Sequence, residues 1–163
     1  MYACPACNRT HKRDRFPLAQ GSPVLVPEQD APGRERPLLI NPRREEKPWH
    51  HIQYRPLIGR WRPLPRRGSR RGAATIEVLG LARPELVDAY THHVSHYLNG
   101  PIEDIREALA LNDGETIRHT WNRAMSRWVR PQQAFTALSY DVFDHHFPRM
   151  QRRGWGLELP EPP

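Results

Sequence analysis

The stretch "TIEVLGLARPELV", residues 75–87, marks the point at which the chain becomes helical. Gly80 ends one apolar repeat with three-to-four spacing, and Pro84 and Glu85 begin the next. Glycine is common just after a helix, whereas proline and acidic residues are favoured in the first turn of one. The stretch therefore predicts two helices joined by a short turn.

The same helical spacing continues through residues 72–148. Its apolar positions are separated by short breaks, at Asn99–Gly100 and at the "NDG" of residues 112–114. These breaks divide the region into about four or five amphipathic helices. The remaining tail, residues 149–163, is rich in proline and glycine and is predicted to be disordered.

Residues 1–71 differ from the helical half because turn-forming residues interrupt them. The segment "HHIQYRPLIGRWRPL", residues 50–64, predicts a β-hairpin whose turn lies near Pro56–Gly59. A short helix is expected from Cys7 to Arg15, because proline follows soon after. The expected fold class is therefore α+β, with a mostly helical second half.

The composition is basic and rich in arginine. The formal net charge is +7, and all but two of the 25 basic residues, Lys12 and Lys47, are arginine. Arginine forks bind phosphates and guanine edges, so the composition is consistent with nucleic acid as a partner. The coding bias of a GC-rich genome explains the same composition equally well, and composition alone leaves both explanations open.

Two basic stretches are the candidate contacts to nucleic acid. One follows the two cysteines near the N-terminus, and the other is "RRGSRR" at residues 66–71. A charge run is either a solvated loop or a phosphate-binding segment, and the sequence leaves both open. The candidate phosphate-binding residues are Arg9, Lys12, Arg13, Arg15, Arg66, Arg67, Arg70 and Arg71.

No segment predicts a membrane span or an export signal. No run approaches the roughly 18 apolar residues that cross a bilayer, and the N-terminus lacks the apolar core of a signal peptide. Two cysteines without an export signal are typical of a reducing compartment. We therefore expect a cytoplasmic protein with reduced thiols and no membrane partner.

Cys4 and Cys7 have the spacing of one half of a zinc site. His11 lies four residues after Cys7, so a helix would bring these two side chains to one side. Structural zinc takes four ligands, and the sequence shows no fourth one. The pair is a zinc site, a reduced pair at a turn, or the surviving half of a lost site.

Two histidine clusters lie in the helical half. His92 and His96 are one turn apart on an expected helix, a spacing that can bind a metal. The second cluster, Asp144 with His145 and His146, lies near a helix end. No glutamate completes an H-E-x-x-H motif in the first cluster. Surface histidines on amphipathic helices are therefore the preferred interpretation of both clusters.

Four stretches together resemble one family. They are "ACPACNRTHKRDRFPL" at residues 3–18, "PLLINPRREEKPWHHIQY" at 37–54, "RGAATIEVLGLARPELVDA" at 71–89, and the helices that follow. In order and approximate spacing they are similar to the C-terminal two-thirds of the HNH endonucleases that pair with AAA-type ATPases in retron and Septu anti-phage systems. The resemblance covers about residues 2–110, and "TIEVLGLARPELV" is its most specific part.

The resemblance implies a partial ββα-metal motif, or His-Me finger, at the N-terminus, within residues 1–71. By this likeness Asn8 would hold a divalent cation, Mg²⁺ or Mn²⁺, and Lys12 would lie near the scissile phosphate. Cys4 and Cys7 match one half of the family's structural zinc site. His11 is a candidate metal ligand and catalytic residue by its position alone, without a counterpart in the family.

This sequence departs from the family pattern at the general base. The family's catalytic histidine and its first CxxC lie upstream of the helix that carries Asn8, and none of the nine histidines here precedes Asn8. Two alternatives are open. Either the chain is part of a DNA endonuclease whose other half lies upstream or on another chain, or it is a non-catalytic module that binds DNA, RNA or the ATPase partner.

Overall fold

The structure is a computed structural model that describes residues 6–24, 34–41, 47–130 and 133–160. Helices predominate, and two strands form a small antiparallel sheet. The predicted α+β class is confirmed at this level. Within the described part of the chain, no helix combines the length and the apolar character that a bilayer crossing requires.

The chain forms two compact units whose segments alternate along the sequence. Unit 1 consists of Met1–Gln53 and Pro63–Arg83, and unit 2 consists of Tyr54–Arg62 and Pro84–Pro163. The boundary at residue 71 that the composition suggested falls inside a helix of unit 1.

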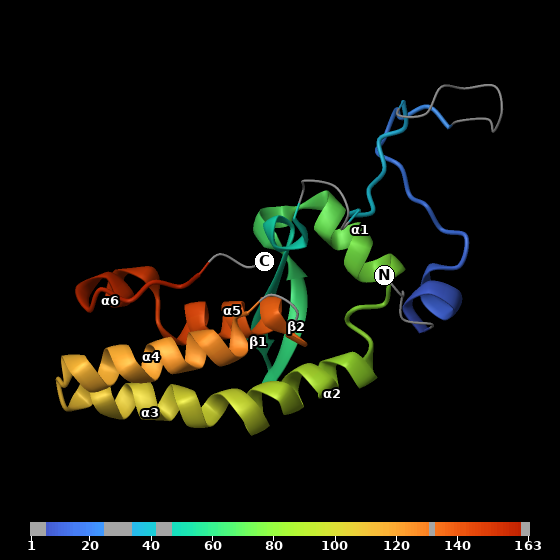
Figure 1. The fold of residues 1–163 in the computed structure, drawn as a ribbon. Helices are drawn as coiled ribbons and strands as arrows, with labels where there is room; N and C mark the ends of the chain where they lie inside the picture. Colours follow the sequence, from blue (N-terminus) through green and yellow to red (C-terminus); the bar gives the residue numbers. More distant parts are fainter. Residues whose placement is uncertain (1–5, 25–33, 42–46, 131–132, 161–163) are drawn as a thin grey trace. The chain divides into compact units, whose positions relative to one another are not determined.

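The two strands form a β-hairpin where the sequence predicted one. Strand β1 is Ile52–Leu57, strand β2 is Arg60–Pro65, and Ile58 and Gly59 form the turn between them (Figure 1). Both turn residues have positive φ, 50° and 71°, as a type I′ turn requires. Positive φ is strained for a β-branched residue such as Ile58. Gly59 suits its position, whereas Ile58 is held at positive φ by the strand ladder on either side of the turn.

Among its described residues, unit 1 contains one regular helix, α1, at Arg70–Val78. Ser69 caps this helix, because its Oγ accepts the N–H of Gly72 at 3.1 Å. The η1 turn covers the first part of the helix expected from Cys7 to Arg15. The short helical turns of the described residues of unit 1 are η1 (Ala6–Lys12), η2 (Pro48–His50) and η3 (Arg66–Gly68).

Helix α1 lies directly against the base of the hairpin. The N–H of Arg66 donates to the carbonyl oxygen of His51 at 2.7 Å, and a Cβ atom on Gly72 would lie 2.1 Å from the same oxygen. On another side, the N–H of Ile40 donates to Oγ1 of Thr75 at 3.1 Å. Only glycine at position 72 leaves room for this approach of two backbones.

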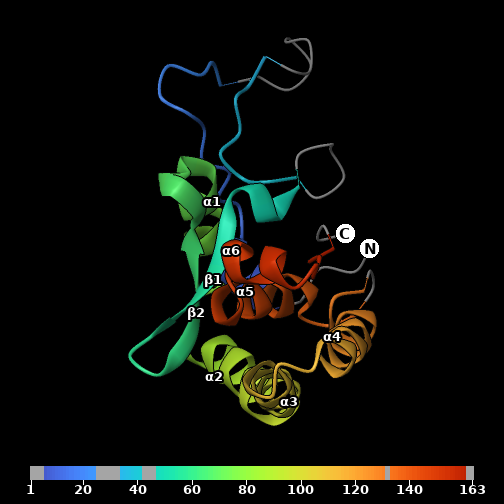
Figure 2. The same ribbon diagram turned by 90° about the vertical axis from the view of Figure 1, so that its left-hand side faces the viewer.

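The helices of unit 2 surround a single apolar core. Trp121, Phe143 and Phe147 are among its largest fully buried side chains. Helices α3 and α4 lie side by side in both views (Figures 1 and 2). The helical elements are α2 (Pro84–His93), η4 (Val94–Leu98), α3 (Asn99–Ala110), α4 (Gly114–Trp128), α5 (Thr136–His146) and α6 (Arg149–Gly154).

The predicted helix end at Asn99–Gly100 is wrong. The π-helical turn η4 connects α2 to α3 without a break, and the N–H of Asn99 donates to the carbonyl of Val94, five residues earlier. Pro101 has no N–H, and in a regular α-helix its ring would crowd the carbonyl of Tyr97. The wider π turn gives the proline ring the room that it needs, so the chain continues as a helix.

Residues 149–160 differ from the disordered tail that the composition suggested. They form α6 and then a segment in which Leu157 is only 7% exposed. The indole Nε1–H of Trp121 donates to the carbonyl of Glu158 at 2.7 Å. A buried indole N–H needs an acceptor, and the tail supplies it. The tail is thereby part of the core of unit 2.

Candidate nucleic-acid interface

The positive charge of the protein is concentrated in unit 1. Its segments, Met1–Gln53 and Pro63–Arg83, hold 14 of the 25 Lys and Arg residues against 7 of the 18 Asp and Glu residues, which gives +7. Unit 2 has 11 basic and 11 acidic residues and is neutral. The entire formal net charge therefore belongs to the unit that contains both predicted basic stretches.

The N-terminal stretch lies against the end of α1 and the turn that follows it. Arg83 anchors it, because its Nη1 donates to the carbonyl of Gly80 at 3.0 Å and to Sγ of Cys7 at 3.4 Å. The ring of His11 lies so close to Gly80 that a Cβ there would be 2.6 Å from Nδ1. Gly80 also has a positive φ of 59°. This glycine therefore allows both the turn and the contact with η1.

The predicted basic residues of this stretch are mostly exposed. Arg9, Arg13 and Arg15 are exposed, and Nζ of Lys12 lies 3.3 Å from the ring centroid of Phe16. Nη2 of Arg15 also donates to the carbonyl oxygen of Val78, at 3.4 Å. Several cations thus reach solvent from one short segment, which is the arrangement that a phosphate backbone favours.

The second basic stretch surrounds the first turn of α1. Arg67 and Arg70 are exposed, whereas Nη2 of Arg71 donates to the carbonyl of Leu39 at 3.2 Å. No acidic residue lies in this first turn. The helix N-terminus carries partial positive charge, so cations there are unfavourable unless an anion joins them. This end of α1 is therefore electrostatically suited to phosphate.

A hydrogen bond joins the hairpin to the cap of α1. Nδ1 of His51 lies 2.7 Å from Oγ of Ser69. Ser69 Oγ also accepts the N–H of Gly72, so one hydroxyl contacts both the helix start and the histidine before the hairpin. The sequence interpretation assigned no role to His51. The serine before the helix could have predicted the N-cap of α1, but no sequence signal predicts that His51 contacts this serine.

Part of the expected metal site lies outside the described residues. Cys4 and the side chain of Asn8 lie outside the described atoms, so the predicted pair cannot be placed. Over residues 6–24, 34–41, 47–130 and 133–160, no three His, Cys, Asp or Glu side chains converge as metal ligands. Cys7 instead contacts the cation of Arg83.

The two histidine clusters of unit 2 have other partners. The rings of His92 and His96 are exposed and stacked, with centroids 5.2 Å apart and planes 12° apart. In the second cluster, Nδ1 of His146 lies 2.9 Å from Nη2 of Arg106, and Asp144 accepts a hydrogen bond from Arg152. The exposure of His92 and His96 agrees with surface histidines on an amphipathic helix, whereas His146 is half-buried.

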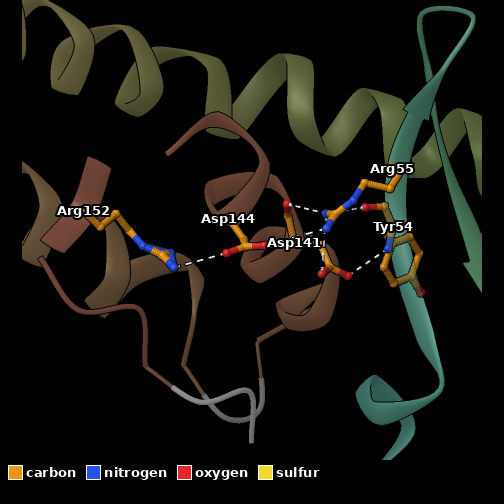
Figure 3. A network of polar contacts seen from close by, with 5 residues as sticks. All are labelled: Tyr54, Arg55, Asp141, Asp144 and Arg152. Carbon is orange, nitrogen blue, oxygen red and sulfur yellow. Dashed lines mark hydrogen bonds and ion pairs between the residues drawn. The ribbon is translucent and has the colours of Figure 1, made fainter. Parts of the chain in front are cut away.

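Unit 2 also contains a partly buried ionic network that the sequence did not predict (Figure 3). Asp141 on α5 is 1% exposed, and its Oδ2 accepts the N–H of Tyr54 at 2.8 Å. Arg55 bridges two acids, with Nη1 3.8 Å from Oδ1 of Asp141 and Nη2 3.7 Å from Oδ2 of Asp144. Arg152 contacts the other oxygen of Asp144 at 3.2 Å. The network ties β1 to α5 and α6, and its role is structural.

Buried His93 predicts a pH dependence for the stability of unit 2. It is 6% exposed, and its Nε2 lies 3.0 Å from Oγ of Ser139. Burial, and then the neighbouring His92, hold the pKa of His93 below its ordinary value. At pH values between that lowered pKa and about 6.5, the His93 side chain is protonated in the unfolded chain but neutral in the folded one. Stability is therefore fully present above about pH 6.5 and is lost as the pH falls through that value.

We expect the free energy of unfolding to fall by up to about 1.4 kcal/mol per pH unit in this window because of His93. Urea unfolding at a series of pH values measures the slope of this free energy against pH. His93→Gln removes the contribution of His93 and lowers the slope, although His146, whose pKa burial also lowers, retains its own contribution. His119→Gln, at an exposed position of α4, is the control and should keep the wild-type slope. An equal slope in wild type and His93→Gln would contradict the assignment.

The comparisons with known proteins add no family or structural neighbour. No protein-family model matches the chain, no curated protein matches it, and no solved structure matches it.

Proposed function

We propose that this protein binds nucleic acid through unit 1. The observation that carries the proposal is the segregation of charge, because the formal net charge of +7 lies wholly in unit 1 while unit 2 is neutral. The exposed Arg67 and Arg70 at the positive end of α1 support it, since no acid in that turn balances them. Phosphate groups supply the missing negative charge.

Substitution of the two exposed arginines tests this proposal. Arg67→Gln/Arg70→Gln leaves the anchoring contact of Arg71 in place. Each lost phosphate contact lowers the slope of log K against log salt by about 0.9 on duplex DNA. We therefore expect weaker binding at low salt and a slope smaller by up to about 2, for duplexes of unrelated sequence alike. Gel retardation across a salt series, with DNA and RNA probes, measures both quantities.

The matched control removes two arginines from unit 2. Arg118→Gln/Arg153→Gln changes the net charge by the same amount at exposed positions of α4 and α6. It should bind nearly as wild type does, because these residues belong to the neutral unit. If the wild type retards no probe at low salt, or if both double variants lose affinity equally, unit 1 is not the binding surface.

A second proposal is that the chain is part of an HNH-type nuclease that acts in anti-phage defence. It rests on the sequence resemblance and on one feature of the structure: Ala6–Lys12 is helical, so Lys12 follows Asn8 by about one turn. In this proposal the N-terminus is one part of a ββα-metal motif, with Mg²⁺ or Mn²⁺ at Asn8 and zinc at Cys4 and Cys7. An AAA-type ATPase or a chain with the catalytic histidine would be the partner.

Plasmid cleavage distinguishes the two proposals. Because the described residues do not bring together a set of metal ligands, we expect no cutting by this chain alone with Mg²⁺ or Mn²⁺. Cutting that appears with a partner chain and is lost in Asn8→Ala, while DNA binding persists, supports the nuclease proposal. Full cutting by Asn8→Ala removes Asn8 from the mechanism.

A further inference from the structure

A pocket of about 280 Å³ lies in unit 2 between the π-helical turn and α4. The π turn and the start of α3 supply one wall, and the second half of α4 supplies the other. The pocket is far in sequence from the basic stretches of unit 1, and neither the fold nor the resemblance gives it a role. Its lining residues are His96, Tyr97, Pro101, Thr120, Arg123, Ala124, Arg127 and Trp128.

The lining carries more positive than negative charge. Arg123 and Arg127 are four residues apart on α4, so they occupy the same face and repel each other. Arg123 is partly balanced by Asp104 on α3, whose Oδ2 lies 3.4 Å from its Nη2. Within the described part of the chain, Arg127 forms no ion pair. An anion placed between the two guanidinium groups would relieve the repulsion.

The guanidinium of Arg127 is held by an aromatic ring. Its central carbon lies 5.0 Å from the ring centroid of Trp128, a cation–π contact that orients the planar group. A guanidinium oriented in advance loses less entropy when it binds a phosphate than a freely rotating one does. Arg127 is exposed, and its contact with Trp128 favours one orientation of the guanidinium at the edge of the pocket.

Aromatic side chains form the other part of the lining. The ring of Tyr97 is 4.7 Å from that of His96 and 5.4 Å from that of Trp128, measured between centroids. Tyr97 is nevertheless 43% exposed, so part of its ring remains accessible to a ligand. Planar heterocycles stack on such rings. The floor is formed by the small or buried Thr120 and Ala124.

From this combination we infer that the pocket binds a nucleoside monophosphate group. The phosphate contacts Arg127 and Arg123, and the base stacks on the accessible ring of Tyr97. The volume is near the lower end of the range of about 300–1,000 Å³ that is typical of small-molecule sites. It suits one base and one phosphate better than a dinucleotide. The same group occurs in a free nucleotide and at the 5′-phosphorylated end of a single strand.

Calorimetric titration of the full chain tests this inference. The probes are AMP, GMP, CMP and UMP, inorganic phosphate, and a short single strand with or without a 5′-phosphate. We expect at least one mononucleotide to bind more tightly than inorganic phosphate. Arg127→Gln should weaken that binding about tenfold, which is the effect of losing one charged hydrogen bond. Tyr97→Leu should remove the preference for a nucleotide over phosphate.

Matched controls separate this site from unit 1. Arg118→Gln removes an exposed arginine of the same helix that does not line the pocket, and it should bind as wild type does. Arg67→Gln/Arg70→Gln should also retain mononucleotide binding, so a failure of the nucleic-acid proposal does not decide this one. Binding of mononucleotides identifies a free ligand, and binding of the phosphorylated strand alone identifies a strand end.

Three results would overturn the inference. The first is the absence of binding by every nucleotide probe at about 1 mM. The second is equal affinity of wild type and Arg127→Gln, with unchanged circular dichroism. The third is that neither a mononucleotide nor the 5′-phosphorylated strand binds more tightly than inorganic phosphate, which would show that the aromatic wall takes no part.

Discussion

Gly72→Ala is expected to lower the free energy of unfolding of unit 1 by about 3 kcal/mol or more. A Cβ at this position would lie 2.1 Å from the carbonyl oxygen of His51, 2.9 Å from its carbon and 3.4 Å from Cα of Pro65. All three atoms belong to the backbone, so no side-chain rotation can relieve the clash. Either α1 moves away from the hairpin base, or the cap at Ser69 is lost.

Urea unfolding followed by circular dichroism and by hydrogen exchange in α1 measures this effect. Gly100→Ala is the matched control, because Gly100 is also helical and its added Cβ would meet nothing within 4 Å. Alanine favours a helix over glycine by about 1 kcal/mol, so the control should be neutral or stabilising. If Gly72→Ala is tolerated as well as Gly100→Ala, the close approach of α1 and the hairpin is wrong.

Asp141→Ala is expected to destabilise unit 2 by about 3–5 kcal/mol, the usual cost of removing one partner of a buried ion pair. The substitution leaves the N–H of Tyr54 without the acceptor that lies 2.8 Å from it. It also removes one of the two acids beside Arg55, which is itself only partly exposed. Figure 3 shows that these groups converge on α5 from β1 and α6.

Asp88→Ala is the control for this second prediction. Asp88 pairs with Arg60, but side-chain exposures of 57% and 47% leave both groups in solvent. Exposed pairs contribute about 1 kcal/mol or less. The unfolding midpoint in urea should therefore shift strongly for Asp141→Ala and weakly for Asp88→Ala. Equal shifts would show that the network of Asp141 is no more stabilising than a surface pair.

Local patterns predicted much of the fold. Apolar spacing predicted the helices between residues 72 and 148, and alternation around a glycine predicted the hairpin of β1 and β2. The continuous helix through Asn99–Gly100 was missed, because the usual end signals were present. The π turn lets the helix continue through these residues despite the end signals. A shift from i−4 to i−5 hydrogen bonding leaves no mark in the sequence except the proline that follows.

Long-range contacts could not be predicted in the same way. Asp141 follows Tyr140 and precedes Val142 in an ordinary amphipathic helix, and its partner Arg55 is 86 residues away. In the sequence, Gly72 is only a glycine near a helix start. Glycine is needed there because the carbonyl oxygen of His51 leaves no room for a Cβ atom. Nothing local specifies which distant backbone approaches a given residue.

The candidate interface was predicted as residues but not as a surface. The sequence identified both basic stretches. It did not show that Met1–Gln53 and Pro63–Arg83 belong to one unit, which is what concentrates the positive charge there. The segment between them, Tyr54–Arg62, belongs to the neutral unit. A sliding window along the sequence averages the two and hides the contrast.

The alternation of the two units has a consequence for how the chain can be divided. Neither unit is a continuous segment, since the chain enters unit 2 at Tyr54, returns to unit 1 at Pro63 and leaves it again at Pro84. A fragment that stops at residue 62 lacks α1, and one that starts at residue 84 lacks β1 and β2. During synthesis on the ribosome, unit 1 can be completed only after the hairpin tip of unit 2 has emerged. A single cut in the chain therefore cannot release either unit whole, because each unit consists of two segments that are separated along the sequence.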